Sequence, residues 1–280
     1  MRRLTAPRIG KGAEHDAQPG LNGHAGDMKT VQERSEQHAV PPKGFAGRSR
    51  QRERMDLESF SRRDVLDTFR IVRRVNRFLG GAAVVRRFLQ EQSRRTPRGR
   101  VLRLLDVGAG DGEMAVTFQR WAARHGIELD ITCVEQNPHA AKLARARIAS
   151  AFADGIRVEE EDIFSYQPAQ WFDVSILSMV CHHFDDERLP HLLQHVWSMT
   201  ARSLLVNDLR RSRLAYLLAS MLFLPAPRVV RHDALLSIRK GFRALELQEL
   251  LAAVGPAEIA TGNRPFFRVE GVVKREGTQR

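Results

Sequence analysis

A glycine-rich turn follows a strand-like run near the middle of the chain. Asp106 lies at the end of the apolar run 101–107, and Gly108-Ala109-Gly110-Asp111-Gly112 leads from it into a helix-like pattern. Glycine lets the backbone turn tightly and come close to a ligand, and a helix start offers free N–H groups. A dinucleotide fingerprint would place its third glycine at position 113, where this chain has Glu113. The turn therefore predicts a ligand site whose spacing disfavours a pyrophosphate.

Polar side chains also follow the next strand-like runs. Glu135, with Gln136 after it, ends the second run, and Asp162-Ile163 follows the third. A carboxylate at the first position can accept both ribose hydroxyls of an adenosine, and one at the second can accept from the adenine amino group while Ile163 packs on the ring. Ser178-Met179 ends the fourth run, beside the glycine turn in a parallel sheet. An acid at one strand end is also common on a solvated surface, but four such features in order predict a nucleoside site.

Histidines and an aspartate follow the later strands, where a pocket for a second ligand is expected. They are His182 and His183 after the fourth strand, Asp208 after the fifth and His232 in the insertion that follows. Histidine can act as a general base because its pKa is near neutral. We predict His232 as the base, with Asp208 either orienting it or binding the substrate, and His183 as a further catalytic candidate. Each histidine has the alternative role of a structural hydrogen-bonding group.

Strand-like and helix-like runs alternate from residue 101 onward, which predicts an α/β fold with a parallel sheet covered on both faces. The last two strands are separated by a short turn, so they should pair antiparallel. Ligands bind beyond the carboxyl ends of the strands in such sheets, which is where the polar motifs lie. The predicted strands are 101–107, 129–135, 156–159, 172–178, 203–208, 257–260 and 266–274, and the predicted helices are 112–125, 138–152, 186–200, 211–224 and 244–253.

The chain divides by composition into three parts. Residues 1–55 are rich in Gly, Pro, Arg, Gln and His and lack apolar runs, which predicts a disordered basic tail. Residues 56–98 show two helical patterns, broken at Gly80-Gly81, which predict a helical cap on the domain that follows. Residues 99–280 form the predicted α/β domain.

The net charge of +12 is confined to the first hundred residues. Residues 1–100 contain 23 Lys and Arg against 11 Asp and Glu, whereas residues 101–280 contain 22 of each kind. A neutral catalytic region offers no electrostatic footprint for nucleic acid, so no nucleic-acid partner is expected. The basic part is expected to be a solvated, Arg-rich surface, with a weak attraction to an anionic membrane or to nucleic acid as the alternative.

The cysteines and the apolar runs bear on whether the protein binds metal, forms disulfides, is secreted or spans a membrane. Cys133 and Cys181 lie in predicted core segments without metal-ligand spacing, so neither a metal site nor a disulfide framework is expected. The N-terminus lacks the apolar stretch of a secretory signal, and the longest apolar run, Leu214–Leu224, is about half a membrane span. A cytoplasmic protein without a transmembrane segment is expected. The helix containing that run is expected to be core, or else to line the pocket and make the bound molecule hydrophobic.

Residues 101–275 resemble the class I S-adenosylmethionine-dependent methyltransferases, which have a Rossmann-like sheet of seven strands with the last one antiparallel. The chain is most similar to small-molecule enzymes related to quinone-biosynthesis methyltransferases and to a bacterial branch found with polyketide synthases. The resemblance implies S-adenosylmethionine as cofactor. It assigns Asp106, Gly108, Gly110 and Gly112 to the family's first motif, Glu135 to the ribose, Asp162 to the adenine, and Ser178 and Met179 to the methionine moiety.

The resemblance implies methyl transfer to a small hydrophobic or aromatic acceptor, such as a phenol, a quinol or a polyketide, at oxygen or carbon. The fourth strand ends in Ser178-Met179-Val180-Cys181, whereas DNA N-methyltransferases carry an Asn/Asp-Pro-Pro-aromatic tetrad there. Three alternatives remain: an RNA methyltransferase that uses the basic N-terminal region, an NAD(P)-dependent oxidoreductase, and a non-catalytic module that keeps the cofactor pocket. The sequence predicts neither the identity of the acceptor nor the oligomeric state.

Overall fold

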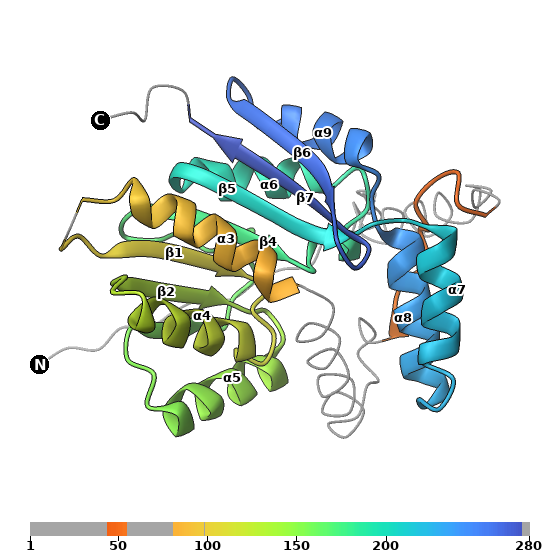
Figure 1. The fold of residues 1–280 in the computed structure, drawn as a ribbon, viewed down its shortest axis with the longest axis horizontal. Coiled ribbons are helices and arrows are strands. Elements are labelled where there is room, and N and C mark those ends of the chain that lie inside the picture. Colours follow the sequence, from red (N-terminus) through yellow and green to blue (C-terminus); the bar gives the residue numbers. More distant parts are fainter. Residues whose placement is uncertain (1–43, 55–80, 98, 276–280) are drawn as a thin grey trace, which may run out of the picture. The chain divides into compact units, whose positions relative to one another are not determined.

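A computed structural model describes residues 44–54, 81–97 and 99–275 of the chain. These residues belong to one compact unit (Figure 1). Most of the predicted tail and the first helical pattern of the predicted cap lie outside the described residues, so both stay predictions.

The domain is built on one sheet of seven strands in the order β3-β2-β1-β4-β5-β7-β6 (Figure 1). Strands β1 to β5 run parallel, and β7 pairs antiparallel with both β5 and β6. This confirms the predicted fold class, including the antiparallel last strand. The strands are β1 Leu102–Val107, β2 Leu129–Val134, β3 Ile156–Glu159, β4 Phe172–Ser178, β5 Thr200–Leu209, β6 Glu258–Arg264 and β7 Arg268–Lys274.

Helices connect the strands and cover the sheet. One of them, α8, was not predicted, because Pro225 and Pro227 precede it and its residues read as a loop insertion. The helices are α3 Gly81–Arg94, α4 Glu113–Arg124, α5 Pro138–Ala151, η2 Cys181–His183, α6 Leu189–Ser198, α7 Arg213–Leu222, α8 Arg228–Lys240 and α9 Ala244–Ala252.

Alternate residues of each central strand enter two hydrophobic cores on opposite faces of the sheet, as the two-residue period of a strand requires. Leu104 of β1 belongs to the core that contains the buried side chains of α3 and α4. Leu105 belongs to the core that contains those of α6 and α9. The central strands are therefore buried on both faces, and the predicted polar motifs lie at their carboxyl ends.

Helix α3 is a core helix of this domain. Val85 and Leu89 are fully buried in the same core as Leu104 and Leu205. The second helical pattern of the predicted cap thus packs directly on the sheet, and the remainder of the proposed cap lies outside the described residues.

Residues 44–54, here called the N-terminal strap, also pack on the domain, although the sequence placed them in a disordered tail. The Arg48 guanidinium donates to the carbonyl oxygens of Lys240 at 2.8 Å and Phe184 at 2.9 Å. It also stacks over the Phe242 ring, 4.2 Å from its centroid. The tail prediction is wrong for the strap because these contacts join residues more than 130 positions apart, which composition cannot reveal.

Candidate active site

The glycine turn between β1 and α4 has the backbone conformation that its composition predicted. Gly108, Gly110 and Gly112 have φ angles of 64°, 59° and 71°. A Cβ on Gly108 would lie 2.7 Å from Val180 Cγ2, and one on Gly112 would lie 3.1 Å from the Cα of Ala144. Larger residues are disfavoured at both positions by the left-handed conformation and by contact, most strongly at Gly108.

Glu135 joins the glycine turn to the end of β2. Its Oε2 accepts from the N–H of Gly110 and its Oε1 from the N–H of Asn137, both at 2.8 Å. Only 8% of the residue is exposed. Burial raises the pKa of Glu135, and these two backbone donors partly offset that rise. The carboxylate is thus fixed between two strand ends, in an orientation suited to accepting from a ligand hydroxyl.

Asp106 is buried beside Glu135 at the end of β1. Burial is the main cause that raises the pKa of its carboxyl to about 7, and the negative charge of Glu135 adds to the effect. Asp106 therefore gains a proton near neutral pH in the protein without ligand.

The remaining predicted cofactor residues lie at the same edge of the sheet. Asp162 is exposed and its Oδ1 accepts from the Phe164 N–H at 3.0 Å, while Ile163 is buried. Ser178 Oγ accepts from Asn207 Nδ2 at 2.9 Å, and the Met179 N–H donates to the Asn207 carbonyl oxygen at 2.9 Å. Met179 has a positive φ of 64°, which is uncommon for a residue with a side chain. Gln136 is exposed and Ala109 is half-buried.

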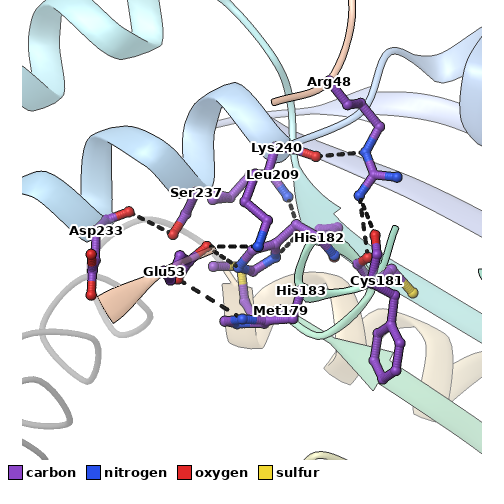
Figure 2. A network of polar contacts seen from close by, with 12 residues as sticks. Arg48, Glu53, Met179, Cys181, His182, His183, Leu209, Asp233, Ser237 and Lys240 are labelled. Atoms are coloured by element: carbon purple, nitrogen blue, oxygen red, sulfur yellow. Dashed lines mark hydrogen bonds and ion pairs between the residues drawn. The ribbon is translucent and has the colours of Figure 1, made fainter. Parts of the chain in front are cut away.

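A second group of polar side chains, here called the histidine cluster, consists of Glu53, His182, His183, Asp208 and Lys240, of which all but Asp208 are labelled in Figure 2. His182 Nδ1 lies 2.7 Å from Asp208 Oδ1, and its backbone N–H donates to Asp208 Oδ2 at 3.1 Å. Glu53 Oε1 lies 3.9 Å from His182 Nε2, and Glu53 Oε2 lies 3.9 Å from His183 Nδ1. Lys240 Nζ lies 3.7 Å from Glu53 Oε1. The strap, η2, β5 and α8 thus bring acidic and basic groups together at one point.

Four members of the histidine cluster are almost wholly buried, whereas the side chain of His183 is 32% exposed. Burial alone would raise the pKa of Asp208, but the contacts with His182 and the Leu209 N–H hold it below its ordinary value. Asp208 is therefore a carboxylate that orients His182. His183 is the member of the cluster that a second ligand could reach.

The histidine cluster lies close to the glycine turn. A charge on His183 lowers the pKa of Glu135, so the two side chains are close enough to interact electrostatically. Val180, two residues before His182, is the side chain that a Cβ on Gly108 would strike. The two groups are therefore neighbouring parts of one site.

His232 occupies a different place from the one expected. Its side chain is 46% exposed on α8, and its Nδ1 lies 3.0 Å from Asp233 Oδ1. The predicted pairing of Asp208 with His232 is wrong, because Asp208 pairs with His182. Among the residues that the structure describes, no contact joins His232 to the histidine cluster.

The histidine cluster includes groups that could hold a metal ion. One ligand atom each from Glu53, His182 and His183 lies within 4.8 Å of the others, and within the described ranges no other such set is found. Lys240 Nζ already places a positive charge beside Glu53. This arrangement favours proton chemistry over a cation at the three groups.

Sequence reasoning missed three buried ionic residues of the site, namely Glu53, Lys240 and Arg268. Arg268 is 1% exposed and contacts the sulfur of Met179. Burial lowers its pKa to about 10, and Asp208 partly offsets that change. Each lies far along the chain from the histidines, so no local pattern marks them.

Comparison with known proteins agrees with this geometry. Residues 104–203 match the sequence model of a family described as a methyltransferase domain. A search of curated proteins finds no match. The matched segment runs from β1 into β5 and contains the glycine turn and Glu135, so the chain is similar to methyltransferases over the part of the sheet that forms the site.

Solved structures of methyltransferases share the fold at low sequence identity. The plantazolicin methyltransferase BpumL, in complex with SAH, has a TM-score of 0.58 and 13% identity over 76% of this chain and 91% of its own. The magnesium protoporphyrin IX methyltransferase ChlM from Synechocystis PCC 6803, with bound SAH, has a TM-score of 0.51 and 14% identity over 71% and 83%. The methyltransferase SibL has a TM-score of 0.49 and 20% identity, and the chain spans 55% of its length while 67% of this chain is covered.

Proposed function

We propose that this domain transfers a methyl group to a small hydrophobic or aromatic acceptor with a dissociable proton, such as a phenol, a quinol or an enolised polyketide. The observation that carries the proposal is the position of His183, which contacts buried Glu53 and lies near Glu135 of the glycine turn. One end of the site is suited to a nucleoside, and the other is suited to removing a proton.

The cofactor end supplies binding and orientation. Glu135 accepts from the ribose hydroxyls, Asp162 and Ile163 hold the adenine, and the glycine turn with Ser178 and Met179 holds the amino-acid end. Two observations support this fit of the site to S-adenosylmethionine. The Glu135 carboxylate is fixed by two backbone N–H groups, and a Cβ at Gly108 would clash with Val180, so the turn there favours glycine. S-adenosylmethionine, when bound there, supplies a methyl group on a sulfonium that is already a strong electrophile.

The acceptor end removes the proton. In the proposed step His183 Nε2 takes the proton of the acceptor, and the Glu53 carboxylate beside Nδ1 stabilises the resulting imidazolium. The acceptor oxygen or carbon forms a bond to the methyl carbon, the bond from that carbon to sulfur breaks, and its electron pair stays on sulfur. His182 and Asp208 hold the neighbouring ring in place.

The acidity of the acceptor limits its class. A phenolic proton has a pKa near 10, which is close enough to that of histidine, about 6.5, for proton transfer to assist the reaction. An aliphatic hydroxyl is a much weaker acid, so proton transfer to histidine would accelerate its methylation little. BpumL and ChlM are named for plantazolicin and magnesium protoporphyrin IX, which are not nucleic acids, and this agrees with the proposal. Location in the cytoplasm and His232 as an alternative base remain predictions.

The test is turnover of phenolic and quinol acceptors with labelled S-adenosylmethionine by the wild type, His183→Ala and His232→Ala. We expect His183→Ala to lower kcat by about 10²- to 10⁴-fold, the usual contribution of a general base, and to remove the acidic limb of the pH profile. His232→Ala should change kcat less than threefold. The base assignment fails if the two variants behave in the reverse way, and methylation of RNA but of no phenol or quinol would overturn the acceptor class.

A further inference from the structure

The connection between β5 and α9 exposes an unusual number of large apolar side chains. Residues 214–227, here called the apolar tip, comprise most of α7 and the loop that leads into α8 (Figure 1). Six of its large hydrophobic residues are between 43% and 65% exposed: Leu214, Leu217, Leu218, Met221, Leu222 and Leu224. Exposed apolar patches of this kind mark interaction surfaces in folded proteins. The sequence-based expectation that this helix is core is therefore wrong.

Helix α7 has its amphipathicity reversed with respect to an ordinary surface helix. Its buried side chains are the small ones, Ala215 and Ala219, which pack in a minor core with Ile238 of α8. Its leucines lie on the outer side. A helix that packs on its own domain would bury leucine in preference to alanine, because burial of the larger side chain removes more apolar surface from water. The outer face of α7 is thus suited to a second apolar environment.

The residues on either side of the apolar tip are basic, which indicates what kind of apolar partner the tip would contact. No charged residue occurs among the fourteen residues between Arg213 and Arg228, both of which are exposed. From residue 209 to residue 243 there are eight Lys and Arg but only one acidic residue, Asp233, which is buried. Two of the eight, Arg211 and Lys240, are buried and paired with Glu246 and Glu53, so six contribute to the surface charge. The rest of the catalytic region compensates for this excess, so the positive charge is local.

We propose that the apolar tip docks on a membrane surface that contains anionic lipids. Apolar side chains between arginines match an acyl layer beneath phosphate groups, which is how interfacial helices bind. No described helix is long and apolar enough to cross a membrane, so the tip would lie in the interface. The proposal does not depend on the acceptor or on catalysis.

Docking at the tip would set the distance from the membrane to the site. Helix α8 begins at Arg228 beside the tip and ends at Lys240, which contacts Glu53. At 1.5 Å per residue the helix separates these two residues by about 18 Å. The histidine cluster would therefore lie no more than about this distance from the docked surface.

The experiment is sedimentation of the full chain with vesicles of phosphatidylcholine alone or with 30% phosphatidylglycerol. We expect binding to the anionic vesicles that weakens with salt, at least a tenfold loss of affinity in the triple variant Leu217→Ser, Met221→Ser, Leu222→Ser, and a smaller loss in Arg213→Gln with Arg228→Gln. Phe152→Ser and Leu245→Ser are matched controls, because these side chains are 90% and 73% exposed at other places, and both should bind as the wild type.

Two results would overturn the proposal. One is unchanged vesicle binding by the triple variant, which would assign any attraction to other basic segments. The other is a dimer of the wild type that the triple variant dissociates without effect on vesicles, which would make a second copy of the chain the occupant. Thermal unfolding of the triple variant is the control for retention of the fold. Since no turnover is measured, failure here is distinct from failure of the proposed methyl transfer.

Discussion

The two ends of the site are built in different ways. The cofactor end is local: Asp106, the glycine turn and Glu135 lie within thirty residues, and two backbone N–H groups hold the Glu135 carboxylate. The histidine cluster is assembled from distant segments, since Glu53 of the strap meets His182 and Lys240, which lie 129 and 187 positions away.

Because of this difference, the two ends of the site should affect different steps, namely cofactor binding at one end and proton transfer at the other. Backbone donors fix the cofactor end, so its geometry depends little on other side chains. At the histidine cluster each group is held by the charge of another, as in the Asp208–His182 pair. Changes at the first end should therefore appear in cofactor affinity, and changes at the second in turnover.

The largest expected effect is at Glu135. Glu135→Ala removes the acceptor for two hydroxyl groups, and hydrogen bonds to a charged group contribute about 1.5–3 kcal/mol each, so affinity for S-adenosylmethionine should fall by at least a hundredfold. Titration calorimetry measures this. Asp130→Ala changes an acid at the opposite end of the same strand, paired with Arg157, and should leave affinity unchanged. Equal losses in both variants would remove Glu135 from the cofactor site.

Glu53→Gln tests the acceptor end without removing a side chain. It deletes the charge that faces His183, which makes His183 a weaker base, so kcat should fall by about tenfold and the acidic limb of the pH profile should move to lower pH. Cofactor affinity should stay within twofold of the wild type. Glu187→Gln, which changes an exposed acid paired with Arg50 of the strap, is the matched control.

Glu53 stabilises the imidazolium, so its loss lowers the pKa of His183, and the acidic limb of the kcat profile should move to lower pH while the maximum decreases. An acidic limb that moves upward, or a maximum that does not change, would contradict the assigned role. The profile is measured under saturating cofactor and acceptor.

Gly108→Ala should destabilise the fold by about 1–3 kcal/mol, because its Cβ would meet Val180 in a left-handed backbone conformation. Gly126 has nearly the same φ angle, 63° against 64°, but nothing within 4 Å of an added Cβ. Gly126→Ala should therefore cost only the conformational part, and thermal unfolding of the two variants separates contact from strain. Equal destabilisation would show that Val180 does not constrain the turn.

The last prediction concerns Asp106 and the pH dependence of the free energy of unfolding. Its pKa is about 7 in the folded protein against 3.8 ordinarily, so the folded state without ligand holds the proton more tightly than the unfolded state. The stability from this group is complete below about pH 4 and is lost as the pH rises through 7. The free energy of unfolding of Asp106→Asn should fall less between pH 5 and 8 than that of the wild type, as denaturant titration would show. A parallel decline in both proteins would contradict the raised pKa.

The sequence predicts most of what is local. The sheet and the cofactor end could be predicted because their residue types reflect local structure. Leu104 and Leu105 follow the alternation of a strand, and the glycines at 108, 110 and 112 mark a tight turn. Glu53 could not, because nothing near it in the chain shows that it meets His182. The leucines of α7 show a second limit: apolar periodicity tells which residues share a face, but it does not tell whether that face is covered.

The most direct test is a crystal structure of the chain with S-adenosylhomocysteine. The account predicts that the ribose hydroxyls bond to Glu135, the amino-acid end lies over the glycine turn, and the sulfur points to the side of the site occupied by His183. A nucleoside bound elsewhere, or a sulfur directed away from the histidine cluster, would contradict it.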